Sequence, residues 1–371
     1  MDRRHFMKTM ARAGRWALLA ALFPVAAYQC AGSRMRGRNR EAFERTRGLS
    51  LREIARDKLH HAPGGFANPF TQDDSGNFGQ VMRWKLFSPN RFKTFYREEE
   101  VRPVRVDWEA VRRHQGLSLT FIKHACLMIQ DQGRRLLVDP IFGGISRLVK
   151  DFSPLDFDPA DAPPPDYVLL THGHFDHIDL PTLAKLGPRT RLISPLGYDG
   201  VFDGLAVKDR TCLDWFESYA SDGLEMTLLP CNHWTMRNPL QGPNRALWGS
   251  YLVKTRSGPT VFVSGDAAWF DGYRELGALY DIDLAVFNLG AYEPRWFMKK
   301  SHMNPEEVVR SFRDLRAARL MIVHWGTFRL GDEPVHFPPR DLRQAMIQAG
   351  LEDRLVHLDH GRTLFFEDLP S

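Results

Sequence analysis

The segment Thr-His-Gly-His-Phe-Asp-His at residues 171–177 restricts the possible fold of this chain more than any other feature. It follows directly on residues 166–170, whose apolar character predicts a buried strand. Side chains on a turn that leaves the carboxyl end of a strand often form the functional site of an α/β sheet. Alternate residues of an extended turn share a side, so His172 and His174 are expected to converge on one ion. Asp176 and His177 then face a second ion.

Three further polar residues stand at the ends of apolar segments. His233 follows residues 226–230, Asp266 ends the segment 260–266, and His324 ends the segment 319–324. Each one alone is typical of an ordinary polar strand end, but the set in this order predicts a site for two metal ions. Imidazole ligands suit zinc, and carboxylate ligands also accept manganese or iron. A loop of exposed histidines is the alternative interpretation of the first motif.

Several longer segments carry a more specific resemblance. They are residues 66–70, 138–142, 246–250 and 290–299, followed by His302, residues 304–307 and residues 322–328. Together with the histidine motif, they resemble the N-acylphosphatidylethanolamine-hydrolysing phospholipases D of the metallo-β-lactamase superfamily, over residues 60–365. The histidine motif identifies only the superfamily, whereas the tryptophan-containing segments are narrower signals.

The resemblance implies an α/β (α+β four-layer) fold, the αββα sandwich, in which two sheets pack face to face with helices outside. Periodicity alone indicates only a mixed α/β sheet. The pattern predicts strands over residues 117–122, 125–130 and 134–138 and helical spacing over residues 49–61. The sequence Asn304-Pro-Glu-Glu307 predicts a helix start, because Asn is a favoured N-cap and Glu at the third position completes a capping box.

The resemblance also implies a role for each candidate residue. The residues expected to bind the two zinc ions are His172, His174 and His233 for the first, Asp176, His177 and His324 for the second, and Asp266 between them. The expected catalytic residues are Asp176, Asp139 as the residue that orients a metal-bound histidine, and His302 as the group that contacts the phosphate or protonates the leaving alkoxide. The expected substrate-binding residues are His302, Ser301, Phe175, Arg295 and Trp296.

The implied reaction is the hydrolysis of a phospholipid phosphodiester to phosphatidic acid and an N-acylethanolamine. The side chains expected to line an apolar groove, although each is also a plausible core residue, are Trp234, Trp269, Trp296 and Phe297. A hydrolase of another ester, such as a sugar-phosphate lactone or a soluble phosphodiester, is one alternative. A non-catalytic protein that binds metal or lipid is another.

Five positions depart from the family pattern. Phe175 stands where relatives have tyrosine, Ser301 where they have glutamine, and Lys123 where they have glycine, while residues 267–268 are Ala-Ala in place of Thr-Gly. None of these departures removes an expected ligand. We expect all of them to affect headgroup recognition. The resemblance therefore predicts the reaction type more firmly than it predicts the substrate.

The basic charge of the chain is concentrated at its beginning. Residues 1–47 hold eleven of the 50 Lys and Arg and three of the 45 Asp and Glu, which leaves 39 basic against 42 acidic residues in the remainder. The catalytic part is therefore slightly acidic, and a nucleic-acid partner is not expected. The sequence predicts a phospholipid substrate and a membrane surface as partners, and it leaves a homodimer open.

The beginning of the chain has the form of an export signal. Residues 2–8 resemble a twin-arginine leader, and residues 16–27 are an apolar segment too short to span a bilayer. We therefore expect a signal over residues 1–30, a basic linker over residues 31–47 and one catalytic domain over residues 48–371. The expected location is the periplasmic side of the cell envelope. Cys30 is either a lipid anchor or an ordinary residue of the leader.

Two other features have alternative interpretations. Residues 81–97 mix aromatic side chains with Lys and Arg, which is typical either of packing over a sheet edge or of a surface that lies on a bilayer. Cys126, Cys212 and Cys231 follow Cys30, without a Cys-x-x-Cys pair. A disulfide framework is therefore not expected, and Cys231 is expected to be structural despite its proximity to His233.

Overall fold

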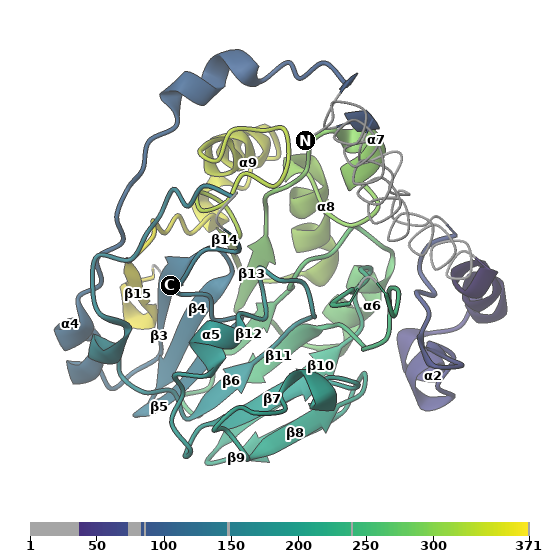
Figure 1. Cartoon of the computed structure of the whole chain (residues 1–371), viewed down its shortest axis with the longest axis horizontal. Helices are drawn as coiled ribbons and strands as arrows, with labels where there is room; N and C mark the ends of the chain where they lie inside the picture. Colours follow the sequence, from purple (N-terminus) through teal and green to yellow (C-terminus); the bar gives the residue numbers. More distant parts are fainter. Residues whose placement is uncertain (1–36, 73–82, 85–86, 147–148, 239, 370–371) are drawn as a thin grey trace, which may run out of the picture.

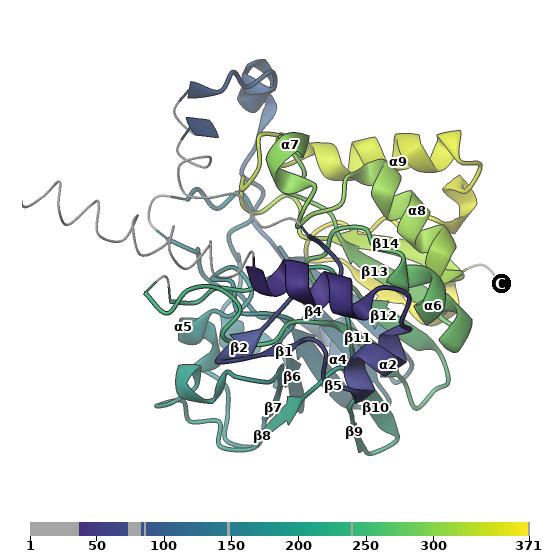
Figure 2. The ribbon, with the colours of Figure 1, turned by 90° about the vertical axis from the view of Figure 1, so that its right-hand side faces the viewer.

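The computed structural model describes residues 37–72, 83–84, 87–146, 149–238 and 240–369. Its two large sheets pack face to face, with helices on their outer faces (Figures 1 and 2). This arrangement confirms the predicted α/β sandwich. The predicted export signal and Cys30 lie outside the described residues.

The first sheet has seven strands and carries the histidine motif. In spatial order it contains β15 (Thr363–Phe365), β3 (Ser118–Lys123), β4 (Cys126–Asp131), β5 (Arg134–Val138), β6 (Tyr167–Leu169), β7 (Arg191–Pro195) and β8 (Arg210–Leu213). Strands β5 to β8 are parallel to one another, whereas β15, β3, β4 and β5 pair antiparallel. The three strands predicted before residue 140 are confirmed to within a residue.

The second sheet has six strands. In spatial order it contains β14 (Arg319–Val323), β13 (Leu284–Asn288), β12 (Thr260–Val263), β11 (Ser250–Lys254), β10 (Leu224–Leu229) and β9 (Ser218–Ser221). Strands β12, β13 and β14 are parallel, and β10 runs in the same direction because both β10 and β12 are antiparallel to β11. The carboxyl ends of these four strands therefore meet at one edge. A separate pair, β1 (His61–Ala62) with β2 (Gly65–Phe66), is antiparallel.

The helices are short and lie outside the sheets. They are α2 (Leu51–Arg56), α4 (Trp108–Arg113), α5 (Leu180–Leu183), α6 (Gly272–Leu279), α7 (Arg295–Met298), α8 (Pro305–Leu315) and α9 (Phe337–Gln348). Short 3₁₀ turns are η1 (Lys93–Glu98), η2 (Pro159–Asp161), η3 (Asp199–Val201), η4 (Glu352–Arg354) and η5 (Phe366–Asp368). None of the helices in the described ranges has both the length and the apolar character needed to cross a bilayer.

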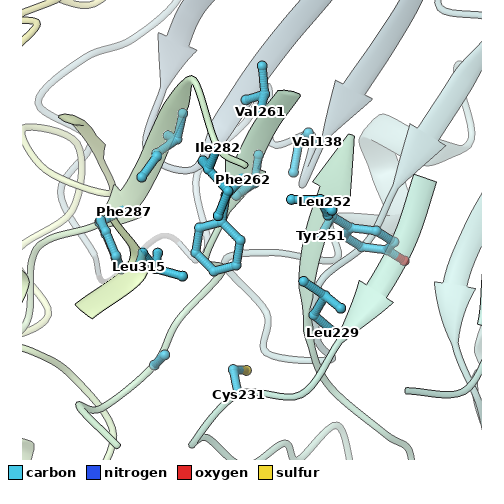
Figure 3. Packing of buried hydrophobic residues seen from close by; sticks show 14 of the residues in the cluster. Val138, Leu229, Cys231, Tyr251, Leu252, Val261, Phe262, Ile282, Phe287 and Leu315 are labelled. Carbon is cyan, nitrogen blue, oxygen red and sulfur yellow. The ribbon is translucent and has the colours of Figure 1, made fainter. Parts of the chain in front are cut away.

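Alternation along the strands divides the core into layers. In β3, Leu119 and Phe121 belong to the large apolar cluster between the sheets, whereas Ile122 belongs to the cluster beneath α4 and α5. Successive side chains of a strand point to opposite faces, so both faces of the seven-stranded sheet are covered. Figure 3 shows part of the large cluster, which includes Val138 of the seven-stranded sheet and Tyr251, Leu252 and Val261 of the six-stranded sheet.

Capping residues set two of the helix starts. Asn304 accepts a hydrogen bond from the backbone N–H of Glu307, and the Glu307 carboxylate accepts one from the N–H of Asn304. The predicted capping box is therefore confirmed. Ser50 and Glu53 form the same reciprocal pair at the start of α2, which is shorter than the predicted helical segment. This reciprocal pairing satisfies N–H groups that a helix start otherwise leaves without partners.

The beginning of the described chain differs from the expected mobile linker. Residues 37–46 are helical, and Asn39, Ala42 and Thr46 are buried. The Asn39 side chain accepts a hydrogen bond from the backbone N–H of Asn68. Residues 37–46 are therefore part of the packed domain, because their spacing places one face of the helix against the loop after β2. Basic composition alone did not reveal this packing.

Candidate metal centre

The side chains at the strand ends meet at one edge of the sandwich. The histidine motif leaves β6, His233 follows β10, Asp266 follows β12, and His324 follows β14. Strands β10, β12 and β14 run in the same direction, so their carboxyl ends meet at one edge of their sheet. The predicted ligands that follow these strands lie together with the histidine motif after β6. Two buried groups of His and Asp result, and the ligand atoms within each group lie within 4.8 Å of one another. They are His172, His174, His233 and Asp266, and His124, Asp176, His177 and His324.

The first group contains the first two histidines of the motif. His172 Nε2 lies 2.9 Å from His174 Nδ1, and His233 Nε2 lies 3.4 Å from the same atom. The Asp266 carboxylate is 3.7 Å from His172 Nε2 and 4.0 Å from His233 Nε2. Gly173 separates the two histidines where a Cβ would lie 2.7 Å from both Tyr198 and Thr235, so only glycine fits this close approach without displacement of a neighbour.

Asp266 of the first group also approaches the second group. His177 Nε2 lies 3.5 Å from Asp176 Oδ2 and 3.3 Å from Asp266 Oδ2. His324 Nε2 lies 3.5 Å from Asp176 Oδ2 and 3.3 Å from Asp266 Oδ1. Asp266 therefore stands between the two groups, which is the position expected of a bridging carboxylate.

Neighbouring polar side chains orient the candidate ligands. Asp139 Oδ2 lies 2.7 Å from His177 Nδ1 and also accepts a hydrogen bond from Thr171 Oγ1. This fixes the ring of His177 with Nε2 toward the two carboxylates. Asn288, at the end of β13, donates to Asp266 Oδ1 at 2.9 Å. Asp139 thus lies in contact with a predicted ligand, His177, whereas Asn288 was not singled out from the sequence.

The residues at the centre fit a metal ion. Within the described ranges, buried ring nitrogens without a hydrogen-bond partner include His174 Nε2, His177 Nε2 and His324 Nε2. A buried polar atom without a partner is costly, and a cation would supply the partner that these nitrogens lack. Such a group of imidazoles and ionised carboxylates is the donor set that zinc and similar ions prefer.

Burial and mutual charge set the protonation of the centre. Burial lowers the pKa of His174 to about 4 and the pKa of His172 and His233 well below the ordinary value. Burial opposes ionisation of Asp266, yet the surrounding histidines bring its pKa well below its usual range. Burial also acts to lower the pKa of His177, but the carboxylates of Asp266, Asp176 and Asp139 raise it well above normal. A cation bound at the centre would take the place of that proton.

The segment expected to face the substrate is hydrogen-bonded to the centre. His233 Nδ1 lies 3.0 Å from the carbonyl oxygen of Ser301, and Trp234 Nε1 donates to Ser301 Oγ at 3.0 Å. His302 Nδ1 lies 3.9 Å from Asp266 Oδ2, and its side chain is 16% exposed. The structure therefore places His302 beside the two groups, at their more accessible side.

Arg295, one of the predicted substrate-binding residues, is hydrogen-bonded to the segment that carries His302. Its guanidinium donates to the carbonyl oxygens of Tyr292 and His302 and to the Glu307 carboxylate at 2.7 Å. These contacts hold the chain that carries His302. Trp296, the next residue, is 46% exposed on α7.

The aromatic side chains named as groove candidates separate into different environments. Trp234 lies edge-on to His174, with ring centroids 4.6 Å apart. Phe175 is 53% exposed, and the Arg237 guanidinium lies 4.4 Å from its ring centre. Trp269 is instead covered by Arg310 and donates to Asp314. Phe297 packs on Trp84. Trp234 and Phe175 therefore border the centre, whereas Trp269 has a packing role.

His124 is, besides Asn288, another residue at the centre that was not predicted from the sequence. It lies in the turn between β3 and β4, is fully buried, and its Nε2 is 3.0 Å from Asp176 Oδ2. The signal available was a single histidine between two predicted strands, beside Lys123. Lys123 itself is fully buried and pairs with Asp151 at 2.5 Å. It therefore packs beneath the site rather than facing a headgroup.

Cys231 is buried, as expected of a structural thiol. Its Sγ lies 3.8 Å from the carbonyl oxygen of Asp266, and burial raises its pKa above the ordinary value. A protonated thiol is a poor metal ligand, since the thiolate is the binding form. Cys126, Cys212 and Cys231 are all free, so the described residues hold no disulfide.

Comparison with known proteins agrees with this geometry. A model of the beta-lactamase superfamily domain matches residues 134–325. The chain is 29% identical over 253 residues to N-acyl-phosphatidylethanolamine-hydrolyzing phospholipase D 1 of Caenorhabditis elegans, which covers 63% of this chain and 70% of that protein. It is 28% identical over 347 residues to the mitochondrial N-acyl-phosphatidylethanolamine-hydrolyzing phospholipase D of Saccharomyces cerevisiae, covering 88% of this chain and 71% of that one.

A solved structure shares the fold. Isothiocyanate hydrolase from Delia radicum gut bacteria matches with a TM-score of 0.56 and 20% identity, over 67% of this chain and 98% of that one. At this identity the likeness concerns the fold alone. The family match covers more than half of the chain and includes both His and Asp groups except His124. The chain therefore belongs to the β-lactamase superfamily, as a metal-dependent hydrolase of the metallo-β-lactamase fold that resembles the N-acyl-phosphatidylethanolamine-hydrolysing phospholipases D.

Proposed function

We propose that this protein is a phospholipase D-type phosphodiesterase that binds two zinc ions and acts on N-acylphosphatidylethanolamine or a related phospholipid. The observation that carries the proposal is the pair of buried His and Asp groups that meet at Asp266. Two relatives named for this reaction share 29% and 28% identity with the chain. Identity at this level supports the reaction class more strongly than it supports the particular lipid.

The residues that would hold the ions follow from the two groups. The first ion would be held by His172, His174 and His233, the second by Asp176, His177 and His324, and Asp266 would contact both. Two neighbouring ions supply a nucleophile from water, orient the phosphodiester and neutralise its charge. Asp139 and Asn288 keep His177 and Asp266 in place for this task.

His302 is the residue best placed to contact the phosphate. Burial lowers its pKa to about 4, so its imidazole is neutral near pH 7. A neutral imidazole has one N–H to donate to a phosphoryl oxygen, which makes this role more favourable than proton transfer from an imidazolium. Arg295 supports the contact indirectly, because it holds the carbonyl oxygen of His302.

Exposed apolar side chains support a lipid substrate presented at a membrane surface. Phe87 is 79% exposed, Trp296 is 46% exposed and Phe175 is 53% exposed. The described part of residues 81–97 also packs on the domain, since Tyr96 donates to the carbonyl oxygen of Asp332. One side of this segment thus packs while Phe87 stays accessible, and aromatic side chains are favoured at headgroup depth.

Hydrolysis in oxygen-18 water tests the reaction. The attacking water oxygen bonds to phosphorus, the bond from phosphorus to the headgroup oxygen breaks, and that oxygen leaves with a proton. The label should therefore appear in phosphatidic acid, and vesicles of N-acylphosphatidylethanolamine should react faster than a short soluble diester. Label in the N-acylethanolamine, or equal rates on both substrates, would contradict the proposal and favour the hydrolase of another, soluble ester.

We also propose export to the periplasmic side of the cell envelope, guided by Arg3 and Arg4. Replacement of both by Lys should retain the protein in the cytoplasm, because the paired guanidinium groups are the expected signal. Fractionation of cells that carry the wild-type and the variant chain measures this. Acyl labelling of the wild type against Cys30→Ser decides lipidation separately.

A further inference from the structure

We infer that His124 is a positioning residue of the metal centre, which fixes the Asp176 carboxylate through a hydrogen bond from Nε2. The inference rests on the proposed metal centre and adds to it a residue outside the seven expected ligands.

Two backbone contacts fix the place of His124. Its N–H donates to Thr327 Oγ1 at 2.8 Å, and its carbonyl oxygen accepts from the N–H of His324 at 2.6 Å. His124 also forms an isolated antiparallel bridge with Trp325. The turn that carries His124 is therefore attached directly to the segment that carries the candidate ligand His324.

The local conformation indicates that this placement is demanding. His124 has φ 51° and His324 has φ 71°, and both values lie in the left-handed region that residues with a Cβ rarely adopt. Such conformations persist only when surrounding contacts stabilise them, and they are concentrated at functional sites. The β3–β4 pairing also has a register shift between Phe121 and Lys123, directly before this turn.

The ring contacts distinguish His124 from the ligands in its group. His177 and His324 each approach both Asp176 and Asp266 through Nε2, at distances of 3.3–3.5 Å. Within the described ranges, the one carboxylate within 4.0 Å of the His124 ring is that of Asp176, at 3.0 Å. The His124 ring therefore contacts Asp176 but does not come within 4.0 Å of the bridging Asp266.

This geometry suits a hydrogen-bond donor better than a ligand. The ring of His124 lies 4.1 Å from that of His324 and meets Phe328 edge-on at 5.0 Å, so it has little freedom to turn. An ionised carboxylate only accepts hydrogen bonds, so the proton of a neutral His124 lies on Nε2. The Nε2 atom that donates to Asp176 has no lone pair left for a metal ion, which leaves Nδ1, a buried atom without a hydrogen-bond partner in the described structure, as the one ring nitrogen that could bind an ion.

The expected consequence is a change in how tightly one ion binds. Loss of a residue that orients a metal ligand typically lowers metal affinity by about 10–100-fold. His124→Phe keeps an aromatic ring but removes the donor, whereas His124→Gln keeps an N–H that can reach Asp176. Zinc content and zinc affinity of the full chain, measured by elemental analysis and by competition with a chelator, report this without any activity assay.

We expect His124→Phe to bind two zinc ions at saturating zinc, with the affinity of one ion lowered by about 10–100-fold, and His124→Gln to regain part of that loss. The matched control is His60→Phe, since His60 is also fully buried and lies 2.7 Å from a buried carboxylate, Asp214. His60→Phe should lose stability without a change in zinc affinity.

Three outcomes would overturn the inference. A His124→Phe protein that binds only one ion at saturating zinc would make His124 a ligand. If the zinc affinity of His124→Phe is unchanged, or if it falls as much as that of His60→Phe, then His124 has a packing role only. If His124→Phe does not fold, His124→Gln decides. A loss of zinc affinity in His124→Gln as large as that in His177→Gln would also contradict a positioning role. If the wild-type chain itself binds fewer than two ions, the proposed function fails instead.

Discussion

The chain contains a second buried cluster of two histidines and an aspartate, and its difference from the metal centre is instructive. His60 Nε2 lies 2.7 Å from Asp214 Oδ1, and His61 Nε2 lies 2.8 Å from Asp214 Oδ2. Lys58 Nζ approaches the same Oδ2 at 2.5 Å, and the backbone N–H of Trp215 donates to Oδ1. Each carboxylate oxygen of Asp214 therefore has two donors.

The metal centre has the same types of residue as the Asp214 cluster, but fewer of its ring nitrogens have hydrogen-bond partners. Its ring nitrogens meet between Asp176 and Asp266, and several of those nitrogens have no protein partner in the described structure. In the Asp214 cluster, the Nε2 atoms of both histidines are engaged, and His60 Nδ1 is the one buried ring nitrogen of the cluster without a hydrogen-bond partner in the described structure. Lys58 also supplies the positive charge there. Proximity of His and Asp thus indicates a metal site only when the ligand atoms remain unpaired.

The largest expected effect comes from removal of the shared carboxylate of the metal centre. Asp266→Ala should lower the hydrolysis rate by at least about a thousandfold, because bound metal contributes several kcal/mol to transition-state stabilisation. It should also lower zinc content while the chain stays folded. Activity, elemental analysis and circular dichroism measure these effects. The control is Asp271→Ala, because the Asp271 side chain is 80% exposed. Full activity of Asp266→Ala would contradict the proposed dinuclear centre.

The matching change in the Asp214 cluster should lower stability and leave zinc content unchanged. Asp214→Asn should lower the free energy of unfolding by about 3 kcal/mol, since it leaves buried His60 and the Lys58 ammonium without their carboxylate. Zinc content should stay at the wild-type value. Chemical unfolding and elemental analysis on the same preparations measure both. A fall in zinc content without a loss of stability would mean that the Asp214 cluster is itself a metal site.

Another buried carboxylate, that of Glu333, has no ion-pair partner in the described part of the chain. It therefore sharpens the comparison. It accepts hydrogen bonds from the backbone N–H groups of Tyr292 and Glu293, and burial raises its pKa to about 7 from 4.5. A raised folded-state pKa means that its stabilisation is full below pH 4.5 and is lost as the pH rises through about 7.

Glu333→Gln removes this titration, so its stability relative to the wild type should improve between pH 5 and pH 8. The improvement should be on the order of 2–3 kcal/mol, because one pKa unit corresponds to about 1.4 kcal/mol. Unfolding by urea at both pH values measures it. The exposed Glu109→Gln serves as the reference, and a stability difference that does not change with pH would show that Glu333 stays ionised.

The smallest effect is expected at the exposed border of the metal centre. Phe175→Tyr restores the side chain that relatives have, at a position 53% exposed. Stability should change by less than about 0.5 kcal/mol, as is usual for surface substitutions. KM for N-acylphosphatidylethanolamine should change by less than about tenfold, because one added hydroxyl contributes about 1 kcal/mol through a hydrogen bond. A complete loss of activity would place Phe175 inside the catalytic arrangement.

Local sequence was sufficient for features that depend on neighbours along the chain. The strands before residue 140 and the capping box at Asn304 follow from alternation and from a three-residue spacing. The ligand motif at residues 171–177 was visible because its members lie within one turn. His233, Asp266 and His324 were found because each ends an apolar segment.

Residues that depend on contacts distant in sequence were missed or misjudged. His124 was missed, because it reaches Asp176, 52 residues later in the chain, from the turn between β3 and β4. Residues 37–46 were expected to be a linker, but they form a helix that contacts the segment after β2. In both cases the partners lie outside the local pattern, so the pattern carried no information about them.

The sequence by itself determined which residue types are available to bind metal and at which strand ends they stand. Only the tertiary structure decided which of the two His and Asp clusters has unpaired ligand atoms, and that His124 reaches Asp176 from another turn. The physical reason is that propensity and spacing act over a few residues, whereas the satisfaction of a buried polar atom depends on every strand that meets at its edge of the sheet.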